Sequence, residues 1–389
     1  MQHIFFIFLT YFVTKVLKIN IFSNTFSKSD LYYRYMKDYV NWEILAPGKI
    51  ANSMAEAMSE SAKNNKTIRL YAVASRHENK AENFSKQWGF AKAYNKYEDL
   101  YNDPEVDAVY VAPSHVLHYK TVKELLKHNK HILCENPAAC NVEQLLEIIQ
   151  TANEKKLFFM EAMWTAFNPT LKKVKEYMDS GIIGTILNIE SKFCTRTKFA
   201  KDGRLWNPNI GGGALQNLGI YNIFFSMFMN NFQGIESFSS NARFKNNVDS
   251  WNCININFSN KVITNFQSAL DVTAGTTAHN ATIYGTKGFI TIKNFYKAEE
   301  AELHIYKSDE GNENEITKIF GVPFEINGYE YELLDATNQI LKGKIDSEVY
   351  TQTDSIYLAS IMNDIREQWN FRYPFENENI CNKDNKKKV

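Results

Sequence analysis

A short turn at residues 46–51, Ala-Pro-Gly-Lys-Ile-Ala, lies between two segments whose apolar residues repeat differently. Apolar residues between 40 and 45 predict a strand before the turn, and Met54 and Met58 predict a helix after it. Aligned to the pattern G-x-G-x-x-G/A, Ala46 takes the first place, Gly48 the second and Ala51 the third. A strand that turns through glycine into a helix can hold a dinucleotide pyrophosphate on the helix N-terminal amides.

We therefore expect Ala46, Gly48, Lys49 and Ile50 to contact a dinucleotide. The glycine matters most, because the backbone at the second place must approach the phosphates closely. A strand-to-helix turn with one glycine is also common in α/β proteins, so the alternative is a turn that binds nothing.

The second predicted strand ends in Val73-Ala74-Ser75-Arg76. An acidic side chain at this place binds the ribose 2′-hydroxyl of NAD, whereas an arginine can pair with the 2′-phosphate of NADP. Ser75 and Arg76 therefore favour NADP. Glu78 lies close enough in sequence to keep NAD possible, and an exposed arginine at a strand end is the alternative.

The third strand runs into Ala112, Pro113, Ser114 and His115, with His118 one turn further on. Ligands of open parallel sheets collect at the carboxyl ends of the strands. We expect Ala112, Ser114, His115 and His118 to line the nicotinamide side of the site. For each histidine the alternative is a residue that begins the helix or packs against it.

These candidates depend on an alternation of strand and helix patterns from Val40 to Glu161, which predicts a parallel sheet with helices on both faces. After Glu161 strands dominate. Residues 254–258 alternate apolar and polar side chains, Ser259-Asn260 predicts a turn, and Val262–Phe266 returns as an antiparallel partner. The fold class is α/β.

The chain has 389 residues with 44 basic and 44 acidic side chains, so its formal net charge is zero. A neutral surface argues against nucleic acid or an anionic membrane as partner and favours a small-molecule ligand. Five scattered cysteines without a CxxC pair predict reduced thiols in a cytoplasmic protein, and neither disulfides nor a metal site.

The two ends of the chain differ from the rest. The apolar run from Ile4 to Val13 is too short to span a bilayer, and Lys15 and Lys18 interrupt the segment after it. We predict that residues 1–35 are an extension outside the fold, which a misassigned upstream start could explain. A membrane anchor is the minority alternative. Residues 377–389 predict a polar tail.

Several ordered segments resemble the glucose-fructose oxidoreductase / inositol dehydrogenase family, most nearly its dihydrodiol dehydrogenase-like branch. The resemblance covers about 40–376 and is carried by residues 42–51, 72–76, 94–100, 103–110, 134–137, 161–164, 211–221, 283–288, 328–332 and 372–376. It implies an N-terminal Rossmann domain, residues 36–161, and a C-terminal α/β domain, residues 162–376, with a large and mostly antiparallel sheet often used for dimerisation. It also implies NAD(P)-dependent hydride transfer at a carbinol or carbonyl carbon of a small polyol, sugar or cyclic diol.

Two polar positions depart from the family pattern. The family usually reads Cys-Glu-Lys-Pro where this chain has Cys134-Glu135-Asn136-Pro137, and the resemblance puts Glu135 and Asn136 at the cofactor. The family's glycine-rich segment continues with an aspartate, which is Asn217 here. Four residues on it has a histidine or, in the dihydrodiol branch, a tyrosine, which this chain retains as Tyr221.

The chemistry explains why these positions matter. Hydride transfer from a carbinol requires loss of the hydroxyl proton, and Tyr221 can move that proton. A tyrosine with a reference pKa of about 10 needs a nearby cation to form phenolate near neutrality. A lysine at position 136 would supply the charge, whereas Asn136 can only donate or accept hydrogen bonds. We expect the catalytic group to comprise Tyr221, Asn136 and Asn217.

Arg204, Lys201 and His115 are candidates for a displaced positive charge. The loop from Arg204 to Pro208 precedes three glycines, and we expect Arg204 and Trp206 to contact the substrate together with Trp164 and Tyr221. Packing inside the protein is the alternative for both tryptophans.

These residues support three hypotheses. The first is a working NADP-dependent oxidoreductase, expected to be a homo-oligomer. The second is a catalytically impaired member that binds the dinucleotide as a binding or regulatory module, because Asn136 and Asn217 are neutral. The third is a protein whose cofactor site is also lost, for which Glu43 inside a buried strand is the support.

Overall fold

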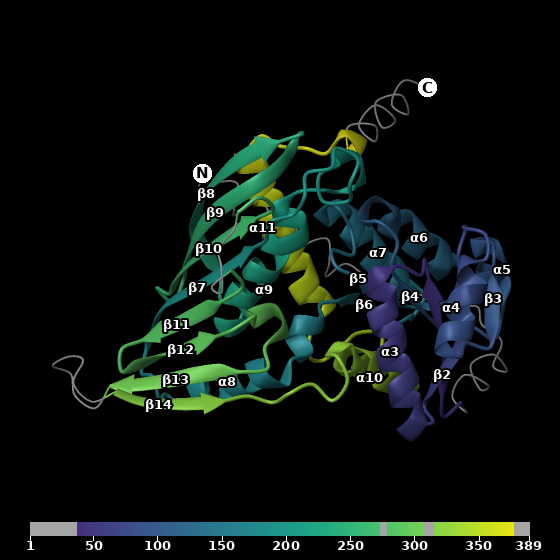
Figure 1. Ribbon diagram of the computed structural model, residues 1–389, viewed down its shortest axis with the longest axis horizontal. Helices are drawn as coiled ribbons and strands as arrows, with labels where there is room; N and C mark the ends of the chain where they lie inside the picture. Colours follow the sequence, from purple (N-terminus) through teal and green to yellow (C-terminus); the bar gives the residue numbers. More distant parts are fainter. Residues whose placement is uncertain (1–36, 273–277, 307–314, 377–389) are drawn as a thin grey trace. The chain divides into compact units, whose positions relative to one another are not determined.

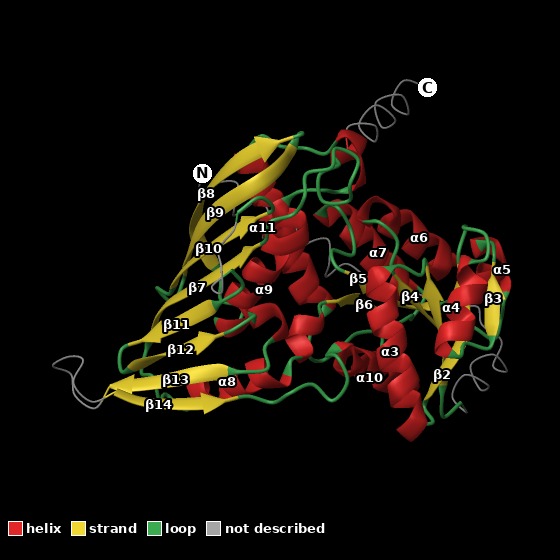
Figure 2. Ribbon diagram, viewed as in Figure 1, coloured by secondary structure: helices red, strands yellow, loops and turns green. Residues whose placement is uncertain are grey.

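The computed structural model describes residues 37–272, 278–306 and 315–376. Within these ranges the chain forms two β-sheets with their helices (Figures 1 and 2). The predicted extension 1–35 and the predicted tail 377–389 lie outside the described residues. The domain boundaries expected from the sequence stay predictions.

The first sheet is parallel, with strand order β3-β2-β1-β4-β5-β6 in the described part of the chain. A helix follows each of its first five strands, so the chain returns to the same edge each time. The elements are β1 (Val40–Leu45), α3 (Lys49–Asn64), β2 (Ile68–Ala74), α4 (Lys80–Trp88), β3 (Lys92–Tyr94), α5 (Tyr97–Asn102), β4 (Ala108–Val111), α6 (His115–Lys127), β5 (His131–Glu135), α7 (Val142–Glu154) and β6 (Phe159–Ala162).

The second sheet has the order β14-β13-β12-β11-β7-β10-β9-β8, and among the described strands of this sheet only β7 and β10 pair in parallel. Its elements are η1 (Trp164–Phe167), α8 (Pro169–Asp179), β7 (Ile186–Cys194), η2 (Pro208–Ile210), η3 (Leu215–Gly219), α9 (Ile220–Met229), β8 (Ile235–Lys245), β9 (Val248–Phe258), β10 (Ile263–Ala269), β11 (Ala281–Gly285), β12 (Gly288–Ile292), η5 (Phe295–Lys297), β13 (Ala301–Tyr306) and β14 (Glu315–Phe320), followed by α10 (Tyr329–Leu341) and α11 (Gln352–Gln368).

The α/β fold class and the mostly antiparallel second sheet are confirmed. The predicted hairpin is the pair β9 and β10, in which Ile256 faces Thr264. The strands β3, β8 and β14 did not have clear signals in the sequence. β8 reads IESFSSNARFK and lies at a sheet edge, where most of its side chains are partly or fully exposed and no apolar periodicity is required.

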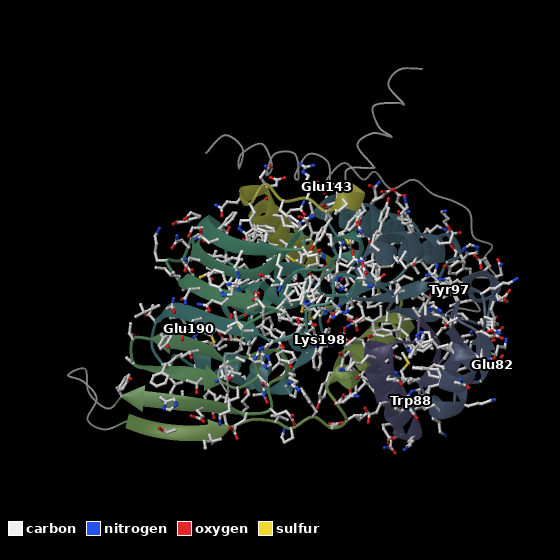
Figure 3. All side chains as sticks on the ribbon, turned by 45° about the horizontal axis from the view of Figure 1, so that its top comes forward. Glu82, Trp88, Tyr97, Glu143, Glu190 and Lys198 are labelled. Carbon is white, nitrogen blue, oxygen red and sulfur yellow. The ribbon has the colours of Figure 1, made fainter. Side chains whose placement is uncertain are left out.

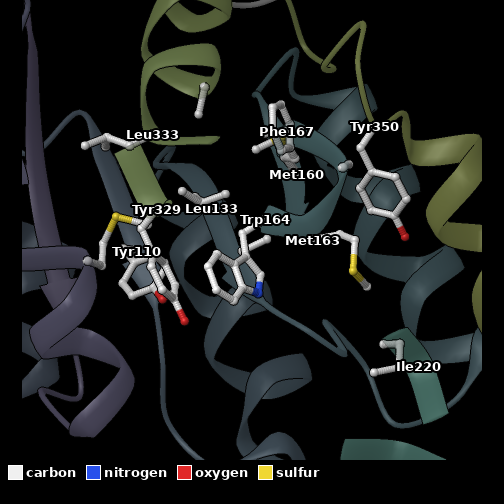
Figure 4. Close-up of a cluster of buried hydrophobic side chains, with 14 of the residues drawn as sticks. Tyr110, Leu133, Met160, Met163, Trp164, Phe167, Ile220, Tyr329, Leu333 and Tyr350 are labelled. Atoms are coloured by element: carbon white, nitrogen blue, oxygen red, sulfur yellow. The ribbon is translucent and has the colours of Figure 1, made fainter. Parts of the chain in front are cut away.

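Helix α10 carries residues from the C-terminal segment onto the first sheet. Its Leu333 and Ala336 are buried in one cluster with Trp42 of β1 and Met54 of α3. The indole Nε1 of Trp42 donates a hydrogen bond of 3.0 Å to the hydroxyl of Thr337 on α10. Figure 4 shows the neighbouring part of this cluster, where Leu133, Tyr329 and Leu333 lie together. The first sheet therefore depends on a helix that follows the second sheet in sequence.

Glu43 is fully buried in the middle of β1, and neither of its carboxyl oxygens has a hydrogen-bond partner among the described residues. Burial raises the pKa of Glu43 well above its ordinary value, with Lys130 partly opposing and Asp103 adding to the rise. Lys130 directly precedes β5, and Asp103 precedes β4, so both lie toward the amino ends of these strands. The turn at 46–51 lies at the opposite, carboxyl ends of the strands. Burial therefore favours the protonated form of this core carboxyl, which gives no support to a lost cofactor site.

We expect Glu43→Gln to raise the free energy of unfolding at pH 8 by about 1–2 kcal/mol. The pKa of Glu43 is higher in the folded protein than in the unfolded chain, where it lies near 4.5. The folded state is therefore most stable, as far as Glu43 is concerned, below pH 4.5, and this contribution declines as the pH rises. Urea denaturation at pH 5 and pH 8 measures the effect, with the exposed Glu82→Gln as control. An equal change at both pH values would show that Glu43 does not titrate in this way.

Candidate active site

The turn after β1 has the backbone expected of a phosphate-binding loop. Ala46 adopts φ of 68°, the left-handed conformation that glycine usually takes at the first place of the pattern. Its amide donates to the carbonyl oxygen of Ala74 at 3.0 Å, which ties the turn to the end of β2. The alanine therefore preserves the backbone path despite its methyl group.

The turn leaves room for a ligand at Gly48. A Cβ built at Gly48 would have the carbonyl oxygen of Ala46 as its nearest atom, at 3.9 Å, so the protein itself does not require glycine there. Helix α3 begins at the next residue without a side-chain cap and without an acidic residue in its first turn. Ile50 in that turn is 42% exposed. Free amides, open space and an uncovered apolar side chain fit a bound dinucleotide.

The two residues expected to select the cofactor differ in placement. Ser75 is buried, and its hydroxyl accepts a hydrogen bond from the amide of His77 at 3.1 Å, so it shapes the turn after β2. Arg76 is exposed, with its guanidinium carbon 5.2 Å from the ring centre of Tyr97 (Tyr97 is labelled in Figure 3). An exposed arginine at this edge can pair with a phosphate.

Helix α6, which follows β4, carries both histidines among its first four residues. His118 is fully buried, and its Nδ1 and Nε2 lie 2.9 Å and 3.1 Å from the carbonyl oxygens of Pro137 and Pro113. His115 is nearly buried, with Nδ1 3.3 Å from the carbonyl oxygen of Gly211. Burial lowers the pKa of both rings. Both histidine rings thus contact backbone carbonyl oxygens of neighbouring loops. Direct contacts with the cofactor stay predictions for His115, His118, Ala112 and Ser114.

Glu135 ends β5 and accepts a hydrogen bond from the hydroxyl of Tyr110 on β4. Burial raises the pKa of Glu135 to about 7, while Tyr110, the amide of Asn136 and the charge of Arg204 act in the opposite direction. Figure 4 shows Tyr110 and Tyr329 with their rings close together at this edge of the sheet. The carboxyl therefore titrates near neutral pH beside the predicted cofactor site.

Asn136 and Tyr221 meet although 85 residues separate them. The Asn136 amide nitrogen donates to the Tyr221 hydroxyl at 3.2 Å and to the carbonyl oxygen of Ala162 at 2.8 Å. Burial and then the charge of Glu135 raise the pKa of Tyr221, whereas the hydrogen bond from Asn136 and the nearby indole of Trp164 lower it. The phenol is therefore protonated at neutral pH.

Aromatic rings surround the Tyr221 phenol. The ring centres of Phe193 and Tyr296 lie 5.7 Å and 5.9 Å from it. Trp164 stacks on Tyr329 at 4.6 Å, and its buried Nε1 has no acceptor in hydrogen-bond geometry among the described residues. The substrate role expected of Trp164 stays a prediction.

Trp206 is placed differently from the expectation. It is buried in the apolar cluster that packs against the second sheet, and its Nε1 donates to the hydroxyl of Thr197 at 3.1 Å. This placement is typical of a packing residue, the alternative that the sequence left open.

Asn217 lies in the π-helical turn η3, directly before α9, which carries Tyr221. Its amide nitrogen donates to the carbonyl oxygens of Gly213 at 2.8 Å and Gly211 at 3.2 Å. Its oxygen accepts a hydrogen bond of 2.7 Å from Nη1 of Arg204. Asn217 therefore connects the glycine-rich segment to an exposed cation.

Two further residues hold the glycine-rich segment, and the sequence does not indicate this role for either of them. Asp249 of β9 is fully buried and accepts from the amide of Leu215 at 2.7 Å, which caps η3. Burial raises the pKa of Asp249 to about 7. Tyr373 donates to the carbonyl oxygen of Gly212 at 2.6 Å. Both contacts join residues far apart in sequence, which is why spacing alone does not reveal them.

No group of three or more histidine, cysteine, aspartate or glutamate side chains in the described ranges is placed to hold a metal ion. The four cysteines in those ranges are free thiols. Within the same ranges no helix has the length and apolar character needed to cross a bilayer.

Comparison with known proteins matches both parts of the chain to one family. The model of the GFO/IDH/MocA oxidoreductase family with an NAD-binding Rossmann fold matches residues 43–163. The model of the GFO/IDH/MocA C-terminal domain matches residues 171–291.

Relatives of known activity match over most of the chain. The trans-1,2-dihydrobenzene-1,2-diol dehydrogenase of Xenopus tropicalis is 31% identical over 339 residues, covering 86% of this chain and 99% of that protein. The mouse enzyme of the same name, from Mus musculus, is 27% identical over 86% of this chain and 98% of its own. The NADP-dependent D-xylose 1-dehydrogenase of Hypocrea jecorina is 34% identical over 47% of this chain and 51% of its own.

Solved structures share the fold. A 3-ketoreductase from Actinomadura kijaniata, in complex with NADP and TDP-benzene, gives a TM-score of 0.75 at 21% identity, covering 85% of this chain and 97% of its own. A levoglucosan dehydrogenase in complex with NADH and L-sorbose also gives 0.75, at 16% identity, covering 85% and 96%.

Proposed function

Because the chain belongs to the GFO/IDH/MocA oxidoreductase family, we propose that it transfers hydride between NADP and the hydroxyl or carbonyl carbon of a small polyol, sugar or cyclic diol, with Tyr221 moving the proton. The observation that carries the proposal is the Tyr221 hydroxyl, 3.2 Å from the Asn136 amide at the carboxyl end of β5. That edge of a parallel sheet is where a dinucleotide binds.

The cofactor part of the proposal rests on the turn at 46–51 and on Arg76. The amides at the start of α3 and the open space at Gly48 would hold the pyrophosphate. Arg76 would pair with the 2′-phosphate, which favours NADP, while NAD remains a possible cofactor. The relatives' names include an NADP-dependent dehydrogenase, and the solved structures hold NADP or NADH.

When bound, the reduced nicotinamide supplies a hydride, and the oxidised form accepts one. In the reductive direction the substrate carbon gains the hydride and its oxygen gains the proton of Tyr221; the resulting phenolate then recovers a proton from solvent. The raised pKa of Tyr221 keeps the phenol protonated at neutral pH, and this is the form that can donate a proton to a carbonyl oxygen. Asn136 orients the hydroxyl, and the surrounding aromatic rings restrict water.

The second candidate function is a catalytically impaired member that binds the dinucleotide as a binding or regulatory module. Asn136 favours it, because an amide stabilises a phenolate by a hydrogen bond without a net charge. We further propose that the protein is cytoplasmic, which its free cysteines in the described ranges support. We also propose that it forms a homo-oligomer, because the second sheet has exposed apolar residues such as Leu187, Ile263 and Ile319.

A binding titration followed by a turnover assay tests the proposal. NADPH is titrated by nicotinamide fluorescence, and polyols, hexoses, pentoses and dicarbonyls are then assayed with wild type and with Asn136→Lys in parallel. We expect NADPH binding, turnover of at least one compound, and no large gain of rate from the lysine. NADPH binding without wild-type turnover, restored by Asn136→Lys, would establish the impaired alternative. Absence of binding would exclude both.

A further inference from the structure

The orientation of the Asn217 amide is fixed by three contacts. Its nitrogen faces the carbonyl oxygens of Gly211 and Gly213, and its oxygen faces Nη1 of Arg204. The reversed amide would place an oxygen against two carbonyl oxygens and an NH₂ group against a guanidinium. Asn217 therefore acts as a double donor to the glycine-rich segment and as an acceptor for Arg204.

An aspartate at position 217 could not make the same contacts. A carboxylate has no proton to donate to the carbonyl oxygens of Gly211 and Gly213. Its negative charge would also cancel the positive charge of Arg204. With asparagine, Arg204 is held in place while its positive charge remains uncompensated by Asn217. The two departures from the family pattern are therefore related: losing a lysine at 136 and an aspartate at 217 leaves the net charge of the site unchanged.

Arg204 is hydrogen-bonded to Asn217, which lies four residues before Tyr221 in the chain. The residue as a whole is exposed, but the protein around its guanidinium lowers the pKa of Arg204, and the charges of Tyr221 and Glu135 raise it. The other two candidates for a displaced charge are less suitable. His115 is buried with a lowered pKa and is neutral, and Lys201 is exposed in the same loop.

We propose that Arg204, held by Asn217, supplies the positive charge at the reaction centre that a lysine at position 136 supplies in the family pattern. Arg204 is then a positioning residue that acts through Tyr221, whereas Asn217 acts through Arg204. The inference rests on the proposed function, since it assigns a charge to the proton transfer by Tyr221. It also accounts for Asn136 without requiring an inactive protein.

The charged and titratable groups around Tyr221 come from several elements. They are Glu135 at the end of β5, Arg204 in the loop before η2, Glu332 and Tyr329 on α10, and Tyr296 on η5. Arg204 is the one cation among these groups. Removing it leaves Tyr221 facing only neutral or acidic side chains of this set.

A double-mutant cycle with full-length protein tests the inference. We expect Arg204→Met to lower kcat by roughly 100-fold in the wild-type background, with NADPH affinity unchanged, and by less than about 10-fold in the Asn136→Lys background, where the lysine restores the charge. Arg204→Lys should retain more activity than Arg204→Met. Arg196→Met, which removes an exposed arginine eight residues earlier, is the control.

Equal losses in both backgrounds would overturn the inference and assign Arg204 to folding or substrate binding. Asn217→Asp provides a second measurement in case Arg204→Met does not fold: it should lower kcat although Arg204 is intact, and unchanged kcat would contradict the proposal. If Arg204→Met is fully active while Tyr221→Phe is inactive, the inference fails and the proposed function stands. If wild type has no turnover, the proposed function fails and the inference fails with it.

Discussion

Replacing Tyr221 with phenylalanine should lower kcat by a factor of roughly 10² to 10⁴ and leave the affinity for NADPH unchanged. The hydroxyl is the group in hydrogen-bond contact with Asn136, and the proposal assigns it the proton that reaches the substrate oxygen. The ring itself remains, so its packing against Phe193 and Tyr296 is preserved. Steady-state kinetics in the reductive direction and a fluorescence titration with NADPH separate the two effects.

The matched control is Tyr284→Phe, which removes an exposed hydroxyl from the second sheet. It should leave kcat unchanged. If Tyr221→Phe keeps wild-type kcat, another group moves the proton, and Glu135 becomes the first residue to replace because its pKa lies at about 7. An equal loss in NADPH affinity and kcat would instead assign Tyr221 to cofactor binding.

Gly48→Ala should weaken NADPH binding by roughly 10- to 100-fold and leave thermal stability almost unchanged. A methyl group at this position meets no protein atom closer than the carbonyl oxygen of Ala46 at 3.9 Å. The fold therefore tolerates it, whereas a pyrophosphate approaching the backbone would not. The dissociation constant and the melting temperature are measured on the same protein.

Gly234→Ala is the control for a new methyl group in open space, because its nearest contact would be the hydroxyl of Ser259 at 3.7 Å. It should change neither quantity. Unchanged NADPH affinity in Gly48→Ala would mean that the pyrophosphate does not lie at this turn. A large fall in melting temperature would mean that the glycine serves the fold itself.

The sequence predicts the large features of the fold because they repeat along the chain. Alternating strand and helix patterns predict the parallel sheet, and the 254–266 alternation predicts the hairpin of β9 and β10. The family expected from the ordered segments is confirmed. β8 was missed because an edge strand with exposed side chains needs no apolar period.

The contacts of the site are less accessible to sequence reasoning. Arg204 and Asn217 are 13 residues apart across a glycine-rich loop, and Asp249 reaches Leu215 over 34 residues. Such pairs depend on how the chain folds back, and no local period reports them. The environment of Glu43 is likewise hidden from the sequence, because a strand covered by helices on both faces buries every side chain.

The packing of α10 on β1 has a consequence for how this protein can be divided. A fragment ending after residue 161 would contain the whole predicted nucleotide-binding part but would lack Thr337, Leu333 and Ala336, leaving Trp42 without its hydrogen-bond partner and part of its apolar cover. The predicted nucleotide-binding part and the C-terminal segment thus share one core. Exchange of the first half between relatives would have to carry this helix with it.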